Sequence, residues 1–314
     1  LTTGGIVSGL EMAMWDICGK ETGKPVYELL GGRVHDKLRA YTYLYPPVGV
    51  DVYSDDPVYN DPAAAAEAAV REVERGFTGV KFDPAGRYSV FDGRQPALQA
   101  MDLSVKMVRA VREAVGTRAD ILFGTHGQFS ASGAIRLAKQ LEKYDPLWFE
   151  EPVPPDSPEE IAKVARATSI PISAGERLTT KYEFHQLLKH GAASILQPNL
   201  GRCGGLLEAK KIASMAEVYH AQIAPHLYCG PVVAAANIQL ATCTPNFLIL
   251  ETIQGWQGFH SQVVKTSIKF ENGFIIPPTE PGLGIELNEE VALAHPYTGS
   301  ELHLEMSALP ATLL

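Results

Sequence analysis

Cysteine is scarce in this chain of 314 residues, which carries only Cys18, Cys203, Cys229 and Cys243. The four lie far apart and form no Cys-x-x-Cys pair, which argues against a disulfide framework and against a zinc cage. This cysteine usage favours a reducing compartment, and we expect a cytoplasmic protein.

Other features are missing as well. No block of basic residues occurs and the net charge is −9, so the sequence gives no support for nucleic-acid binding. No apolar run exceeds six residues, whereas a membrane-spanning helix needs about 20, so we expect no membrane partner. No glycine-rich dinucleotide loop follows any apolar run. With 46% hydrophobic and 20% charged residues, the composition is that of an ordinary globular protein.

Short apolar runs alternate with helical patterns along the chain. The runs are rich in Ile, Leu, Val and Phe and predict buried strands at 37–45, 79–83, 120–124, 147–151, 170–176, 194–199, 221–226 and 247–251. Between them, the stretch 102–116 repeats apolar residues at helical spacing, as do 132–144 and 205–220.

The spacing of the strand ends indicates the fold. Gly124 and the residues that end the next five runs recur every 23–27 residues. A steady βα period with eight strands is typical of a (β/α)₈ barrel; an open doubly wound sheet is the alternative. Two segments, 45–62 and 83–100, interrupt the period after the first and second strands. They either shape a substrate pocket or serve as packing decoration.

Charged and polar residues gather where the strands end. The ends carry Lys81, Asp83, Gly124, His126, Glu150, Glu176, Arg177, Asn199, His226 and Glu251. In a parallel barrel these ends converge on one face, where catalytic groups lie. Carboxylates on neighbouring strands suit Mg²⁺, although each glutamate taken alone could form a salt bridge with a loop cation.

Five stretches carry a resemblance to a known family: "EMAMWDICGKETGKPVYELLGG" (11–32), "WFEEP" (148–152), "SAGERL" (173–178), "QPNLGRCGG" (197–205) and "IAPH" (223–226). In this order they resemble the mandelate racemase-like branch of the enolase superfamily. His126, His226 and Glu251 together resemble acid-sugar dehydratases of the galactonate dehydratase type.

The resemblance implies an α/β fold: a modified (β/α)₇β barrel whose N-terminal α+β capping domain is largely missing from this chain. Residues 1–35 would form a helix linking that domain to the barrel, 36–272 the catalytic barrel, and 273–314 a segment returning to the capping domain. Such enzymes are commonly homo-oligomers. They act on a small sugar acid and remove the proton α to its carboxylate with the help of Mg²⁺.

The chain departs from the family pattern at the metal site. Glu150 and Glu176 match two of the three acidic metal ligands that the resemblance implies, but Gly124 stands where the first, an aspartate, is expected. His126, Gln128, Asp83 or additional waters could complete the coordination. We expect Asp83, at the end of the neighbouring strand, to replace the missing ligand.

The resemblance also implies roles for the other site residues. His226 matches the general base, with Asn199 where an aspartate normally supports it; Asn199 can orient the imidazole but cannot stabilise its cation, which makes His226 a weaker base. The alternative is a buried neutral histidine bonded to Asn199. His126 matches the acid that assists loss of the β-hydroxyl.

Three further residues resemble groups that contact substrate. Lys81 matches the first lysine of a Lys-x-Lys pair whose second position is Asp83, and Glu251 resembles a glutamate that bonds substrate or enolate oxygen. Lys81, Arg177 and Glu251 are therefore the expected substrate-binding residues, with Lys81 and Glu251 also acting in catalysis.

These assignments favour a Mg²⁺-dependent dehydratase that converts a sugar acid to a 2-keto-3-deoxy acid. Racemisation, epimerisation or cycloisomerisation is a second possibility, although the missing second lysine counts against epimerisation. A catalytically impaired protein that binds acidic sugars is a third, supported by Gly124 and Asn199.

Overall fold

The computed structural model describes residues 2–45, 57–84 and 93–296. The chain separates into two compact units. Of the described residues, the first contains 2–40, Gly175–His185 and 196–296; the second contains 41–45, 57–84, 93–174 and Gln186–Ile195. Most of the two interrupting loops, at 46–56 and 85–92, lies outside the described residues, so their role remains a prediction.

The second unit is built on parallel strands. They are the end of β1 (Leu38–Tyr43) followed by β2 (Gly79–Phe82), β3 (Asp120–Gly124), β4 (Trp148–Glu150) and β5 (Ile172–Ala174). Phe82 pairs with Phe123, and Gly124 pairs with Glu150, so the ends of β2, β3 and β4 lie level with one another. This register brings together the residues that follow the strands.

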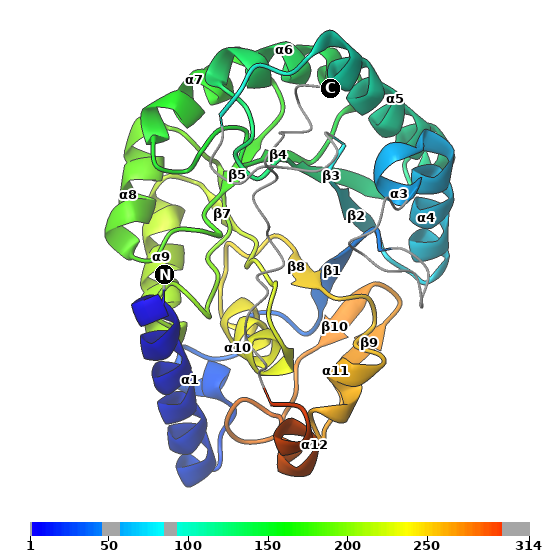
Figure 1. Ribbon diagram of the computed structural model, residues 1–314. Helices are drawn as coiled ribbons and strands as arrows, with labels where there is room; N and C mark the ends of the chain where they lie inside the picture. Colours follow the sequence, from blue (N-terminus) through cyan, green and yellow to red (C-terminus); the bar gives the residue numbers. More distant parts are fainter. Residues whose placement is uncertain (1, 46–56, 85–92, 297–314) are drawn as a thin grey trace. The chain divides into compact units, whose positions relative to one another are not determined.

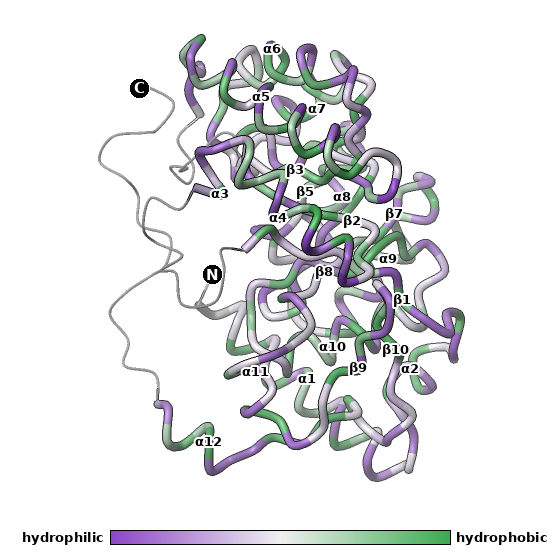
Figure 2. The backbone as a smooth tube through the Cα atoms, turned by 90° about the vertical axis from the view of Figure 1, so that its right-hand side faces the viewer, coloured by the Kyte–Doolittle hydropathy of each residue, from purple (hydrophilic) through white to green (hydrophobic). Residues whose placement is uncertain are grey.

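Helices cover the strands of the second unit. In Figure 1, α4 (Pro62–Glu74), α5 (Leu98–Val115), α6 (Ala131–Leu141) and α7 (Pro158–Ala167) follow one another around the outside of β2 to β5. Figure 2 shows hydrophilic and hydrophobic residues alternating along α5 and α6, as expected for helices with one buried face. Of the predicted apolar stripe on α5, Met107, Val108, Val111 and Val115 are fully buried.

Local signals fix where these helices begin and end. Asp61 caps α4, because its carboxylate accepts the Ala63 N–H at 2.9 Å, and Pro62 occupies the first helical position. Ser130 caps α6 in the same way through Gly133 N–H. Gly116 ends α5 with φ +58°, a conformation that favours glycine.

The first unit joins helices to short strands and an antiparallel hairpin. Its helices are α1 (Thr2–Thr22), α2 (Val26–Leu29), α9 (Leu206–Val218), α10 (Pro231–Thr242), α11 (Phe259–Gln262) and α12 (Glu289–Ala294). Its strands are β7 (Gln222–Ile223), β8 (Leu250–Thr252), β9 (Lys269–Glu271) and β10 (Phe274–Ile276). The remaining elements are α3 (Pro57–Asn60), the 3₁₀ turn at Glu142–Tyr144, α8 (Lys181–His190) and β6 (Ile195–Leu196).

The hairpin of β9 and β10 was not predicted from the sequence. Asn272 and Gly273 connect its strands with φ +47° and +83°, which is the turn that Asn-Gly favours. The hairpin pairs with the beginning of β1, where Leu38 lies opposite Ile275. The eight predicted strands, by contrast, are confirmed as β1 to β8.

Two of the residues behind the family resemblance have a structural role. Glu11 on α1 caps the N-terminus of α9, since its carboxylate accepts the N–H groups of Leu206 at 2.7 Å and Leu207 at 2.9 Å. A side chain at Gly205, which has φ +89°, would collide with this carboxylate. Glu11 and Gly205 therefore hold α1 against α9.

Candidate functional site

The ends of β2 and β4 are joined by a buried ion pair. Lys81 donates to Glu150 Oε1 at 2.5 Å, and both side chains are about 1% exposed. A buried charge is costly without a partner, so this pair explains how both residues are accommodated at the strand ends. The predicted substrate-binding lysine and the predicted metal ligand are thus in contact.

Asp83 and His126 form a second contact in the same unit. Asp83 Oδ2 lies 3.0 Å from His126 Nδ1, and the aspartate side chain is buried. The other oxygen, Oδ1, has no hydrogen-bond partner among the described residues. A Cβ placed on Gly124 would lie 3.0 Å from that oxygen. The aspartate that follows β2 therefore occupies the space beside the glycine that ends β3.

The turn that carries His126 has an uncommon backbone. His126 has φ +48° and Gly127 has φ +73°. The turn is tied to the end of β4, because Gly127 N–H donates to Glu151 O at 2.8 Å and Thr125 Oγ1 donates to the same oxygen at 3.0 Å. Glu151 itself has φ +39°. Such conformations cost energy, and surrounding bonds are needed to hold them.

In the first unit, Asn199 bonds to His226. Asn199 Oδ1 accepts the Gly201 N–H at 2.8 Å, which leaves its amide nitrogen to donate to His226 Nδ1 at 2.9 Å. Because Nδ1 accepts, the neutral ring carries its proton on Nε2. Nε2 faces Glu176 Oε2 at 3.3 Å. The predicted contact of Asn199 with His226 is confirmed, and it selects one tautomer.

Arg177 and Glu251 also lie beside carboxylate or backbone partners. Arg177 Nε lies 3.4 Å from Glu176 Oε1, and both side chains are buried. Glu251 Oε2 accepts the Leu227 N–H at 2.6 Å, directly after His226 in the chain. The structure thus brings Glu176, Arg177, Asn199 and His226 into one hydrogen-bonded and charged group, with Glu251 bonded to the neighbouring backbone.

The donor chemistry of the predicted metal ligands fits a hard cation. Asp83, Glu150 and Glu176 are buried carboxylates, and an oxygen of Asp83 lacks a partner in the described residues. In residues 2–45, 57–84 and 93–296, no group of three or more His, Cys, Asp or Glu side chains is arranged as a ligand set. Each carboxylate instead faces a cationic or histidine side chain, with which a metal ion would compete.

Two further polar residues lie in this turn; the sequence had offered Gln128 as a possible cation ligand but gave Thr125 no role. Thr125 is fully buried and connects the ends of β3 and β4 through its hydroxyl. Gln128 is 1% exposed, and neither atom of its side-chain amide is hydrogen-bonded within the described part of the chain. The available signal was their position in the chain, since Thr125 directly precedes His126 and Gln128 follows it by two residues.

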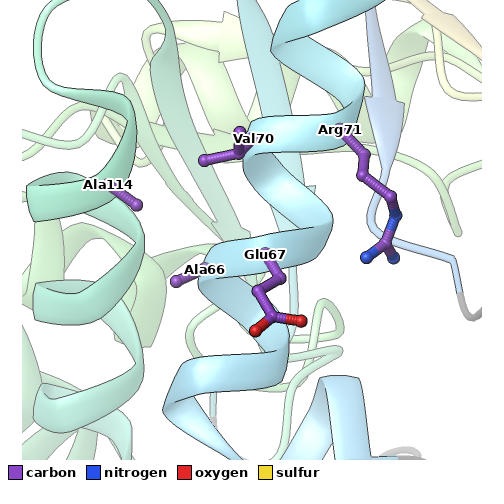
Figure 3. A pocket seen from close by; sticks show the side chains of 5 residues that line it. All are labelled: Ala66, Glu67, Val70, Arg71 and Ala114. Carbon is purple, nitrogen blue, oxygen red and sulfur yellow. The ribbon is translucent and has the colours of Figure 1, made fainter.

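A separate hollow of about 440 Å³ lies on the helical layer. Figure 3 shows it between α4 and α5, lined by Ala66, Glu67, Val70, Arg71 and Ala114. None of the strand-end residues lines it, so it is not the site of the chemistry.

Known proteins are similar to this chain. The family model for enolase C-terminal domain-like proteins matches residues 64–291. The chain belongs to the enolase superfamily. The α/β barrel class predicted from the sequence is confirmed by solved structures of the same group.

Two solved structures illustrate the agreement. One from Labrenzia alexandrii DFL-11, assigned to the mandelate racemase/muconate lactonizing enzymes, is 64% identical with a TM-score of 0.93 and is matched over 97% of this chain and 77% of its own. A mandelate racemase/muconate lactonizing enzyme from Sulfitobacter sp. is 55% identical with a TM-score of 0.94, over 99% of this chain and 77% of its own.

Within the superfamily, two similar curated proteins are dehydratases. D-xylonate dehydratase of Haloferax volcanii is 36% identical over 94% of this chain and 70% of its own length. D-galactonate dehydratase of Variovorax paradoxus is 36% identical over 90% of this chain and 72% of its own length. The predicted resemblance to acid-sugar dehydratases is confirmed. No helix in the described part of the chain is long and apolar enough to cross a membrane.

Proposed function

We propose that this protein is a Mg²⁺-dependent dehydratase of a sugar acid, yielding a 2-keto-3-deoxy acid. The presence of both His126, which is mostly buried, and His226, which is buried, after strand ends in a chain 36% identical to D-xylonate and D-galactonate dehydratases carries the proposal. Dehydration needs one group that removes a proton and another that protonates the leaving hydroxyl. The two histidines provide these two groups.

His226 is the proposed base for the proton α to the carboxylate. Abstraction through Nε2 requires a free lone pair on that atom, whereas the bond from Asn199 places a proton there. The ring can act as a base when its proton lies on Nδ1. The Asn199 amide must then rotate so that its oxygen accepts the Nδ1–H, and that oxygen loses its hydrogen bond from Gly201 N–H. Proton abstraction is therefore slower than it would be beside an aspartate.

His126 is the proposed acid for the β-hydroxyl. Hydroxide is a poor leaving group, so its departure requires a proton. Asp83 faces Nδ1 of His126, and Nε2 is the atom that we assign to the substrate. The contact with Asp83 orients the His126 ring for this step.

Lys81, Arg177 and Glu251 are the proposed substrate contacts. Lys81 and Arg177 are buried cations whose charges suit the carboxylate and oxyanions of a sugar acid. Glu251 accepts hydrogen bonds from sugar hydroxyls, or stabilises the enolic oxygen when protonated. Lys81 and Glu251 thereby also assist catalysis.

The proposed metal ligands are Glu150, Glu176 and Asp83. When bound, Mg²⁺ supplies positive charge that stabilises the negative charge developing on the substrate carboxylate. Oxygen donors alone meet its preference, and waters would fill the other positions.

A catalytically impaired protein that binds sugar acids is the second candidate. Gly124 and Asn199 favour it, because each replaces a carboxylate that the resemblance leads one to expect. To decide, the full-length protein is incubated with Mg²⁺ and a panel of aldonic and aldaric acids, and keto acid is detected as its semicarbazone. His226→Gln should abolish the product, while His220→Asn, at an exposed position, should not.

Racemisation or epimerisation is tested in the same assay. In D₂O, an enzyme that only exchanges the α proton incorporates deuterium into recovered substrate without forming keto acid. Keto acid as the main product supports dehydration; binding of a sugar acid with neither exchange nor keto acid would support the impaired protein.

A further inference from the structure

The ends of β2 and β3 carry a carboxylate and a glycine side by side. Phe82 pairs with Phe123, so Asp83 and Gly124 follow directly at the same level. Gly124 in turn pairs with Glu150 on β4. A carboxylate on either of the two adjacent positions would therefore lie at the same strand-end level as Glu150.

The space beside Gly124 is taken by Asp83. A Cβ at position 124 would meet Asp83 Oδ1 at 3.0 Å, whereas the next neighbours, Lys81 Cε at 3.6 Å and Glu150 Cβ at 3.8 Å, are ordinary contacts. Gly124 has no left-handed backbone that would require glycine. A side chain at position 124 would require the Asp83 carboxylate to shift by a few tenths of an ångström, which favours glycine there.

The Asp83 carboxylate has the chemistry of a cation ligand. Its side chain is buried, and Oδ1 has no hydrogen-bond partner among the described residues. Among the described residues Lys81 pairs with Glu150, and Asp83 pairs with His126. A buried carboxylate oxygen without a donor is costly unless something binds it.

We propose that Asp83 and Gly124 are an exchanged pair. Asp83, which follows β2, supplies the carboxylate that binds a divalent cation, in place of a carboxylate at position 124 at the end of β3. Oδ1 of Asp83 is the ligand atom, and Oδ2 keeps its contact with His126. One side chain then serves both the cation and the acid. This inference rests on the proposed function, since it concerns the cation of that same site.

The test measures cation binding, independently of turnover. Mn²⁺ replaces Mg²⁺ as the probe, and the signal of free Mn²⁺ in electron paramagnetic resonance gives the affinity of the full-length protein. Asp83→Ala should weaken Mn²⁺ binding by about tenfold or more. Asp102→Asn, on the exposed face of α5, should leave it unchanged.

Moving the carboxylate back provides the decisive comparison. In Asp83→Ala the oxygen that blocks position 124 is gone, so the double variant Asp83→Ala/Gly124→Asp has room for its new side chain. It should recover Mn²⁺ affinity to within about threefold of wild type, because the carboxylate returns to the same level of the strand ends. Its matched control, Asp83→Ala/Gly124→Ala, fills the space without a carboxylate and should not recover binding.

The outcomes separate this inference from the proposed function. Wild-type affinity in Asp83→Ala, or no gain of the Asp double variant over the Ala double variant in folded protein, would overturn the exchange and leave the dehydratase standing. No Mn²⁺ or Mg²⁺ binding by the wild type, even with a sugar acid present, would overturn both. Circular dichroism establishes that each variant is folded.

Discussion

Asn199 holds His226 by its amide nitrogen and not by its carbonyl oxygen. The nitrogen donates to Nδ1 at 2.9 Å while the oxygen accepts from Gly201 N–H at 2.8 Å. The backbone of Gly201 therefore decides which way the amide points, and through it which nitrogen of the histidine carries the proton.

Asn199→Asp should accelerate the reaction. Both carboxylate oxygens accept hydrogen bonds, so one keeps the Gly201 N–H and the other binds a proton on His226 Nδ1. Nε2 is then free to act as a base. We expect kcat to rise about tenfold or more, since a wrong tautomer in a comparable pair elsewhere costs about 10⁴-fold.

Two measurements check this tautomer argument. The ¹⁵N chemical shifts of the His226 ring should show that the proton lies on Nε2 in wild type and on Nδ1 in Asn199→Asp. Asn60→Asp introduces the same charge at an exposed position and should alter neither the shifts nor kcat. A wild-type ring already protonated on Nδ1 would contradict the assignment.

Lys81→Met should make stability depend on divalent cations. It removes the ammonium that contacts the buried Glu150 carboxylate, and breaking such a pair costs about 3–5 kcal/mol. A divalent cation at Glu150 would restore positive charge, so added Mg²⁺ should raise the Tm of this variant more than that of wild type. Lys106→Met breaks an exposed pair with Asp102 and is the control; equal Mg²⁺ shifts in all three proteins would refute the prediction.

Thr125→Val should loosen the turn that carries His126. The valine keeps the shape of the buried side chain but loses the hydroxyl that donates to Glu151 O, and the loss of one such hydrogen bond costs about 0.5–1.5 kcal/mol. Urea unfolding measures the loss, and kcat should fall with it. Thr125→Ser retains the hydroxyl; if it is as damaging as valine, the hydrogen bond is not the cause.

Glu142 should stabilise the protein in a pH-dependent way. Bonds from Ser169 N–H, Lys139 and Thr168 lower the pKa of its carboxyl from 4.5 to about 2. A lowered folded-state pKa means that the stabilisation is present above pH 4.5 and is lost as the pH falls towards 2. The Tm of Glu142→Gln should therefore lie below that of wild type at pH 7 and approach it near pH 2.

A neighbouring surface carboxylate serves as the control for this pH dependence. Glu113 on α5 is exposed, and Glu113→Gln should leave the Tm almost unchanged at pH 7. A difference in Tm between wild type and Glu142→Gln that stays constant from pH 7 to pH 2 would show that the carboxyl charge does not contribute to stability.

The strands, and with them the candidate site residues at their ends, could be predicted from the sequence because they follow a period. Buried strands leave apolar runs, and the residues that end them recur at nearly equal spacing, so Glu150 and His226 stood out. The hairpin at 269–276 was missed although Asn272-Gly273 signals such a turn, because the runs on either side are short and contain charged residues.

The finer geometry of the site could not be read in this way. The orientation of the Asn199 amide depends on one backbone N–H, and the left-handed conformations of His126 and Glu151 depend on bonds between two strand ends. The sequence indicated Asp83 as a substitute for the missing aspartate, but it did not show that the Asp83 carboxylate lies against the space beside Gly124. The boundaries at residues 35 and 272 remain predictions.

The most direct test of this account is the incubation of full-length wild-type protein with Mg²⁺ and sugar acids, among them D-xylonate and D-galactonate, with detection of keto acid. We predict a 2-keto-3-deoxy acid from at least one of them, formed by wild type and not by His226→Gln. Binding of a sugar acid and Mg²⁺ without any keto acid, under conditions in which Asn199→Asp is also inactive, would contradict the proposal that this protein is a dehydratase.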